Sequence, residues 1–398
     1  MSAIYPFAAL RPAPGAAAAV ASVPYDVVST EEARALAEGN PLSFLRVSRP
    51  EIELPPGSDP HAEAVYDLAA RNFSRLKNAA PLIVEAEPAF YVYRLHMGQH
   101  VQSGIAACFS IDEYDRDLIK KHEKTRPDKE DDRTRHMLAI AAQTGPVFLT
   151  YRASTEVDAA VARATDGDPL FDIVPPDGVR HQIWRAPADV NQQIVDAFAT
   201  IDCLYIADGH HRAASAARSR RALATKGAGS HDRVLAVAFP DNQMQVLAYH
   251  RVVRDLHGLT ANEFLASLKR RLAVTTGGPT TPARKGEVAI YLAGAWHTIA
   301  LPTDAHALDV DTLHNTILEP VLGIDDERTD KRIDFVGGIR STAALEQLVD
   351  SGSFAVAFSM FPVSVEDLMR VSDAGDTMPP KSTWFEPKLR DGLLSHLL

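Results

Sequence analysis

The sequence predicts an α+β fold with mixed sheets. Short segments of strand composition are interspersed irregularly with helical segments, whereas a doubly wound sheet needs a regular alternation of the two. No segment repeats with a period of about 20–50 residues, so a solenoid or a propeller is not expected. At 398 residues, of which 46% are hydrophobic, the chain can bury one large core or two of medium size.

Residues 1–111 are predicted to form an N-terminal α/β region. Ser29 or Thr30 suits a helix cap, and acidic residues follow in what would be the first turn. Apolar side chains between Val65 and Leu76 recur at helical spacing. Met97-Gly98 separates two apolar runs and favours a hairpin. The predicted elements are helices over 31–38 and 61–78 and strands over 43–48, 90–96 and 103–110.

Residues 112–225 are predicted to form a core region that begins with the most charged stretch of the chain, 112–135. The elements expected after this stretch are helices over 137–143, 155–165 and 189–200 and strands over 146–151, 181–185 and 203–207.

Residues 226–398 are predicted to form a C-terminal α/β region that packs on the core region. Two apolar runs, 233–239 and 245–251, are expected to pair as antiparallel strands across a turn at 240–242. The other elements expected here are helices over 260–272, 309–322 and 365–371 and strands over 288–293, 296–301 and 354–358.

Composition excludes several classes of protein. The formal charge of −11 argues against a nucleic-acid-binding protein, which normally carries a basic face. No segment approaches the ~20 apolar residues of a membrane span, and residues 1–10 lack the features of a signal peptide. Cys108 and Cys203 lie in apolar runs, which fits a reducing compartment, although a bridge between them stays open. A cytoplasmic protein without a membrane partner is therefore expected.

The most informative motif is Asp208-Gly209-His210-His211-Arg212. An apolar strand ends at the Asp-Gly turn, and an alanine-rich helix begins within two residues. The N–H groups and the dipole of a helix N-terminus attract anions, and Asp208 adds a carboxylate of the kind that holds a divalent cation beside phosphate. The structural alternative is an ordinary capped helix with surface His and Arg side chains.

The charged stretch supplies a second candidate site, around Glu123. Phosphoryl transfer needs cations on the phosphates and a carboxylate that orients or deprotonates the attacking hydroxyl. We therefore expect Glu123 to supply the base or a metal ligand, Lys124, Thr125 and Arg126 to bind phosphate, and His122 to contact the substrate. A solvated charged loop or helix is the alternative.

Other site types find little support in the sequence. A zinc protease would need a second His at position 126, which is Arg, and the adjacent His210 and His211 point in different directions in regular structure. Neither a P-loop nor a Gly-x-Gly-x-x-Gly motif after a strand is present.

Two proline-containing segments are further candidates. Tyr25 and Asp26 follow Pro24 at a rigid turn and are expected to line a substrate pocket. After Pro379-Pro380, the side chains of Lys381, Ser382 and Thr383 are expected to reach a phosphate, although a plain surface loop is an equal alternative.

These motifs together resemble a known family. Residues 23–29, His122-Glu123-Lys124-Thr125, the Asp-Gly-His-His-Arg element and residues 378–383 follow, in order and through nearly the whole chain, the bacterial family catalogued as domain of unknown function 1015. The Asp-Gly-His-His-Arg element is also similar to the signature of the ParB/sulfiredoxin-like superfamily, in which free-serine kinases carry the same five residues at a strand-to-helix turn. The resemblance implies a ParB/sulfiredoxin-like core with flanking α/β elaborations.

The resemblance also implies a function. It indicates a nucleotide-dependent kinase, a phosphotransferase to an alcohol group, that phosphorylates a small hydroxylated metabolite. The leading candidate is free L-serine, which would be converted to O-phosphoserine. Asp208 would hold Mg²⁺, and Gly209 to Arg212 would cradle the phosphates of ATP or ADP. With Glu123 as our own assignment of the base, the expected catalytic residues are Glu123, Asp208, His210 and His211.

Two other functions stay open at this stage. A nucleotide-binding regulator would bind the nucleotide without turnover, and a phosphate-ester hydrolase would use Asp208 and the histidines without an acceptor. The sequence also leaves open the acceptor, the phosphoryl donor and the oligomeric state, for which a homodimer is compatible with the composition.

Overall fold

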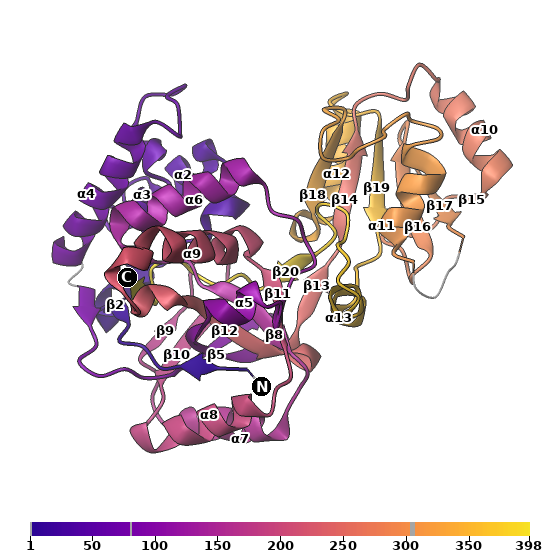
Figure 1. The fold of residues 1–398 in the computed structure, drawn as a ribbon. Helices are drawn as coiled ribbons and strands as arrows, with labels where there is room; N and C mark the ends of the chain where they lie inside the picture. The colour runs from indigo at the N-terminus through magenta and orange to yellow at the C-terminus, as the bar shows by residue number, and fades with distance from the viewer. Residues whose placement is uncertain (1, 80–81, 303–306) are drawn as a thin grey trace. The chain divides into compact units, whose positions relative to one another are not determined.

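The computed structural model describes residues 2–79, 82–302 and 307–398 (Figure 1). The chain divides into two compact units, Met1–Met244 with Pro387–Leu398, and Gln245–Glu386. The first unit is therefore built from two separate segments of the chain, with the second unit between them in sequence. Regions 1–111 and 112–225 of the sequence analysis both lie in the first unit, and region 226–398 is shared between the two units.

The first unit is centred on a nine-stranded mixed sheet. Its strand order is β6-β11-β8-β12-β5-β4-β10-β9, with β1 paired to β5. β11 runs parallel to β6 and β12 runs parallel to β8, whereas the other neighbouring strands are antiparallel. The mixed sheet confirms the α+β class. The strands are β1 (Ile4–Tyr5), β4 (Tyr91–Met97), β5 (His100–Ser110), β6 (Ile119–Lys120), β8 (Val147–Tyr151), β9 (Phe171–Ile173), β10 (Arg180–Arg185), β11 (Leu204–Asp208) and β12 (Arg233–Pro240).

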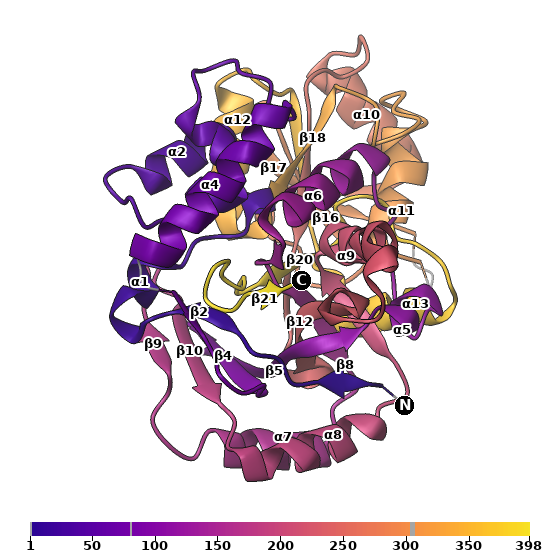
Figure 2. The same ribbon diagram turned by 60° about the vertical axis from the view of Figure 1, so that its left-hand side comes forward.

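Helices cover both faces of this sheet (Figure 2). α7 and α8 pack on one face, and α9 packs on the other with α6 against it. The side chains between these layers form one continuous apolar core, which explains why the central strands are buried on both faces. The helices are α1 (Ala17–Val20), α2 (Thr30–Ala37), α3 (Leu45–Ser48), α4 (Glu63–Ala79), α5 (Ile111–Asp115), α6 (Pro127–Ile140), α7 (Thr155–Ala164), α8 (Asn191–Ala199) and α9 (His210–Leu223).

Two short pairs complete the first unit. β2 (Leu10–Pro12) pairs with β3 (Leu82–Val84), and β21 (His396–Leu397) pairs with β7 (Ala142–Gln143). The second pair ties the C-terminal segment of the chain into the first unit.

The second unit is an antiparallel sheet of six strands with helices. Its order is β15-β17-β16-β19-β14-β18, and β13 pairs separately with β20. The strands are β13 (Gln245–Leu247), β14 (Tyr249–Val253), β15 (Ala273–Thr276), β16 (Glu287–Leu292), β17 (Ala295–Ala300), β18 (Ile333–Gly337), β19 (Val356–Met360) and β20 (Trp384–Glu386). The helices are α10 (Ala261–Arg271), α11 (Asp309–Leu313), α12 (Ser341–Asp350) and α13 (Val365–Asp373), with a π-helical turn at His314–Leu318.

The prediction of a strand over 43–48 is wrong, because residues 45–48 form helix α3. Phe44 and Val47 pack into one apolar cluster and Leu45 packs into another. A spacing of three residues brings two side chains to the same face of a helix but to opposite faces of a strand. The burial of this short run therefore requires a helix.

The predicted pairing of 233–239 with 245–251 is also wrong. β12 pairs with β5 and β8, and β14 pairs with β18 and β19. The proline turn suggested a local hairpin, but each strand has partners that are distant in sequence. The helix predicted over 137–143 is the end of α6 followed by β7, and the hairpin around Met97-Gly98 is confirmed as β4–β5.

Gly104 in β5 offers a test of the central sheet. A Cβ atom at this position would lie 2.6 Å from the Ala238 carbonyl oxygen and 2.8 Å from Cδ1 of Phe239 in β12. We expect Gly104→Ala to lower the free energy of unfolding by about 1–3 kcal/mol, because the backbone of β12 must move to make room for the added methyl group. Urea denaturation followed by circular dichroism measures this, with Gly167→Ala as the control, since no atom lies within 4 Å of a Cβ there. Equal stability of the two variants would contradict the packing described.

Candidate functional site

The candidate site begins where β11 ends at Asp208 and α9 begins at His210. Gly209 lies between them with φ +94°, and a Cβ atom there would lie 2.9 Å from Cζ of Arg212. Glycine is therefore required both by the left-handed backbone and by the close guanidinium. The N-cap residue of α9, Gly209, has no side chain to cap the helix, and the first turn of α9 contains no acidic residue. This helix N-terminus can therefore receive an anion.

Arg212 is buried against this turn and is held by acidic groups. Its Nη2 atom lies 2.9 Å from Oδ2 of Asp208 and 3.8 Å from Oδ2 of Asp26, and its Nη1 atom donates to the Pro146 carbonyl. Burial alone would lower the pKa of Arg212, but Asp26 and Asp208 outweigh it and raise that pKa. The guanidinium is thus a fixed positive charge at the base of the site.

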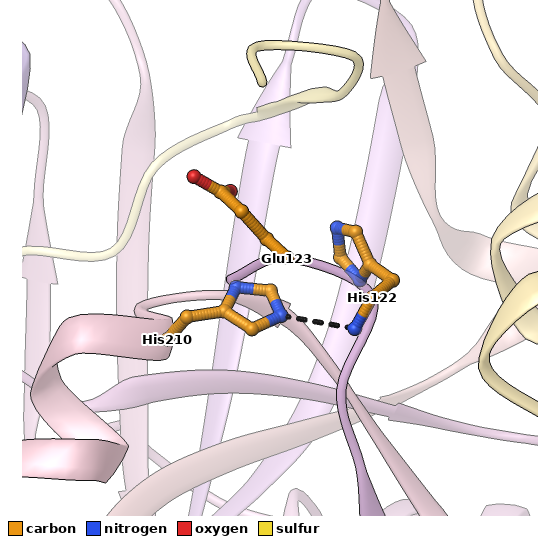
Figure 3. Close-up of side chains that lie close together, drawn as sticks. All are labelled: His122, Glu123 and His210. Atoms are coloured by element: carbon orange, nitrogen blue, oxygen red, sulfur yellow. Dashed lines mark hydrogen bonds between the residues drawn. The ribbon is translucent and has the colours of Figure 1, made fainter. Parts of the chain in front are cut away.

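The two histidines join the charged loop 121–126 to α9. The His122 backbone N–H donates to Nε2 of His210 at 3.4 Å, and the Arg126 N–H donates to Nε2 of His211 at 3.1 Å. Side chains at adjacent positions of α9 thus hold two points of the loop. The two motifs found in the sequence therefore form one site (Figure 3).

His122, Glu123 and His210 form a compact cluster at this junction (Figure 3). One potential ligand atom from each side chain lies within 4.8 Å of the other two. The two imidazole rings are 4.5 Å apart and nearly perpendicular, at 89°. Burial lowers the pKa of His122 to about 4, although a hydrogen bond with the Ile206 carbonyl opposes the shift.

His210 is likewise uncharged at neutral pH. Burial, followed by the neighbouring His122, holds the pKa of His210 well below its ordinary value. The cluster therefore offers imidazole nitrogens as neutral groups beside a partly exposed carboxylate.

A small polar cavity borders the buried arginine. Its volume is about 40 Å³, and its lining includes Tyr25, Arg133, Arg212 and Asp391. Burial raises the pKa of Asp391 to about 7, although the Arg212 charge opposes the shift. Gly145 permits this arrangement, because a Cβ there would lie 2.7 Å from Oδ1 of Asp391.

The structure brings several predicted site residues together. The assembled residues are Tyr25, Asp26, His122, Glu123, Arg126, Asp208, Gly209, His210, His211 and Arg212. Thr125 lies in the same loop and donates to Glu130, and Lys124 is exposed there.

Lys381, Ser382 and Thr383 belong to the second unit. Lys381 is exposed and has φ +56°, and the Ser382 hydroxyl donates to the Pro379 carbonyl at 2.7 Å. Their predicted contact with phosphate stays a prediction.

Sequence reasoning missed the contribution of residues 387–398. Lys388 Nζ lies 3.6 Å from Oδ2 of Asp208, and Asp391 shares the polar cavity with Arg212. The signal available was the charged run Lys388 to Asp391 among apolar neighbours, with Asp391 buried in the structure. This run indicates that the charged side chains are paired, but it does not indicate with which residues.

The resemblance implies Mg²⁺ on Asp208, and the geometry there does not favour it. Oδ2 of Asp208 already faces the cations of Arg212 and Lys388, at 2.9 and 3.6 Å. Both would repel an added divalent ion. The cluster of His122, Glu123 and His210 is the other group at this site that could hold a metal.

Comparison with known proteins gives a family match. The profile of the family described as "Protein of unknown function (DUF1015)" matches residues 4–321. Comparison with curated proteins gives no significant match.

Several solved structures are similar to this chain. Free serine kinase in complex with AMP is 15% identical with a TM-score of 0.38, over 73% of this chain and 91% of that one. A conserved hypothetical protein from Pyrococcus furiosus is 16% identical with a TM-score of 0.37, over 73% and 95%. SbnI with a C-terminal truncation, from Staphylococcus aureus, is 14% identical with a TM-score of 0.39, over 73% and 87%.

None of the described helices combines the length and the apolar character needed to cross a bilayer.

Asp391 predicts a pH dependence of stability. Its pKa is raised from 3.8 to about 7 on folding, so the folded protein binds the proton more tightly than the unfolded chain. The stabilisation is complete below about pH 4 and is lost as the pH rises towards 7, by at most about 4 kcal/mol. We expect Asp391→Asn to reduce the loss of stability between pH 4 and 7.

Urea denaturation across this pH range measures the effect. The exposed Asp168→Asn variant is the control and should keep the wild-type profile. An unchanged profile in Asp391→Asn would contradict a raised pKa of Asp391 in the folded protein.

Proposed function

We propose that this chain, which belongs to the DUF1015 family of proteins of unknown function, is a nucleotide-dependent kinase that phosphorylates a small hydroxylated metabolite. The observation that carries the proposal is the joining of loop 121–126 to the start of α9 by His210 and His211. These two bonds put a carboxylate, Glu123, beside a helix N-terminus that can receive phosphate. Phosphoryl transfer needs this pairing of a base with a phosphate site.

The phosphate end of the site is the first turn of α9. Its backbone N–H groups and the helix dipole favour an anion. Arg212 strengthens the positive potential, and its bonds to Asp208 and Pro146 keep it in place. We assign the nucleotide phosphates to this turn, with the exposed Lys124 and Arg126 as further cations.

Glu123 is the proposed general base. The acceptor oxygen attacks the terminal phosphorus of the nucleotide, and the bond from this phosphorus to the bridging oxygen breaks. The hydroxyl proton passes to a carboxylate oxygen of Glu123. The neighbouring imidazoles of His122 and His210 are neutral, so they do not compete as a charged partner for the carboxylate.

L-Serine is the proposed acceptor. This choice rests on the resemblance of residues 208–212 to the motif of free-serine kinases, as does the proposed ParB/sulfiredoxin-like core. Tyr25 and Asp26 lie beside Arg212 and are proposed to contact the acceptor. The resemblance also implies Mg²⁺, for which Asp208 is a poor ligand beside two cations.

We expect the purified protein to form O-phosphoserine from L-serine with ATP or ADP and a divalent cation, measured by mass spectrometry. Glu123→Gln should lower kcat by about 10²–10⁴-fold, because it keeps the shape of the side chain but cannot accept the proton. Its affinity for the nucleotide, measured by calorimetry, should remain near that of the wild type.

The control is Glu87→Gln, which replaces an exposed carboxylate by a carboxamide and should leave turnover unchanged. Nucleotide binding without phosphorylation of any hydroxyl amino acid would favour the regulator. Phosphate release that does not depend on an acceptor would favour the hydrolase. Full turnover by Glu123→Gln would exclude Glu123 as the base.

A further inference from the structure

We infer that His122, Glu123 and His210 bind a divalent transition-metal ion such as Mn²⁺ or Zn²⁺, and that Asp208 is not a ligand of this ion. The inference deepens the proposed function, on which the role of the ion in phosphoryl transfer rests: one carboxylate oxygen of Glu123 binds the ion, and the other remains to accept the proton of the acceptor hydroxyl. The binding itself rests on the geometry of the three side chains alone.

The three side chains are already close enough for one ion. Their potential ligand atoms lie within 4.8 Å of one another. Ligand nitrogens and oxygens lie about 2.0–2.2 Å from Zn²⁺, so two ligands of one ion are about 3.4 Å apart in a tetrahedral site. Binding of one ion therefore requires small rotations of the three side chains, of which Glu123 is the most exposed.

The histidine rings are oriented as metal ligands usually are. A hydrogen bond with the backbone carbonyl of Ile206 fixes the His122 ring. Metal-binding histidines commonly use one ring nitrogen for such a bond and present the other to the ion. Nε2 of His210 accepts the His122 N–H at 3.4 Å, so an ion would be bound by Nδ1 of this ring, which would change tautomer and release this long hydrogen bond.

The donor set selects the kind of ion. Two imidazoles and one carboxylate suit Mn²⁺, Fe²⁺ or Zn²⁺, whereas Mg²⁺ prefers oxygen ligands in near-octahedral geometry. Three protein ligands also leave positions for water or phosphate oxygens.

Charge separates the cluster from Asp208. The carboxylate of Asp208 faces Arg212 and Lys388, whose positive charges oppose a second cation at that oxygen. The carboxylate therefore stabilises Arg212, and the ion is expected among the histidines.

The cluster also has an explanation without a metal. The perpendicular imidazole rings and the hydrogen bond from His122 to His210 could hold the loop on α9 by themselves. Direct measurement of metal binding distinguishes the two explanations.

The test is Mn²⁺ binding to the full-length protein after treatment with a chelator and without nucleotide. Free Mn²⁺ gives an electron paramagnetic resonance signal that is lost on binding, and Zn²⁺ should compete. We expect one Mn²⁺ per chain, at least tenfold weaker binding in Glu123→Gln, a smaller decrease in Asp208→Asn, which removes a neighbouring charge but no ligand, and unchanged binding in Glu87→Gln. Because His210→Ala removes a buried side chain, Glu123→Gln is the primary variant, and circular dichroism checks its fold.

Three outcomes would overturn the inference. They are the absence of Mn²⁺ and Zn²⁺ binding in the wild type, wild-type affinity in Glu123→Gln, and binding that is weaker in Asp208→Asn than in Glu123→Gln. Because no turnover is measured, the outcome is independent of the kinase assay. Metal binding at the cluster without phosphorylation of any acceptor would retain the inference and reject the proposed function. Serine phosphorylation without metal binding at the cluster would retain the proposed function and reject the inference.

Discussion

The candidate site depends on the parallel pairing of β6 with β11. Leu204 lies opposite Ile119 and Tyr205 opposite Lys120, so the carboxyl ends of both strands meet at one edge of the sheet. The loop that leaves β6 therefore passes the helix that leaves β11. The hydrogen bonds of His210 and His211 to the loop backbone hold this contact, although β6 contains only two residues. Without the parallel pairing, Glu123 would not lie beside the start of α9.

Burial determines the charge state of the groups around this contact. The imidazoles of His122 and His210 lose their protons, whereas Arg212 keeps its charge because Asp26 and Asp208 accompany it. Neutral imidazole nitrogens and a fixed cation therefore lie within the same site. In water, the histidines would be partly charged near pH 6.5 and could not act as uncharged ligands over the same range.

The sequence was sufficient to predict the parts of the site that are local in the chain. The strand–turn–helix at Asp208 and the position of most helices follow from spacing and glycine chemistry, and the α+β class is confirmed. The contacts of Lys388 and Asp391 were not predictable, because their partners lie some 180 residues or more away. The predicted pairing of 233–239 with 245–251 was wrong for the same reason, because the strands that pair with β12 are distant in sequence. The error at 43–48 arose because a run of six residues fits either a helix or a strand until its packing is known.

The division of the first unit into two segments has a consequence for synthesis in the cell. A ribosome delivers residues 1–244 long before residues 387–398, since the whole second unit is translated between them. Until then, β7 has no β21 to pair with, and the polar cavity beside Arg212 lacks Asp391. A chain terminated before residue 387 would therefore leave this cavity incomplete and β7 unpaired, which would make this part of the first unit a target for proteolysis.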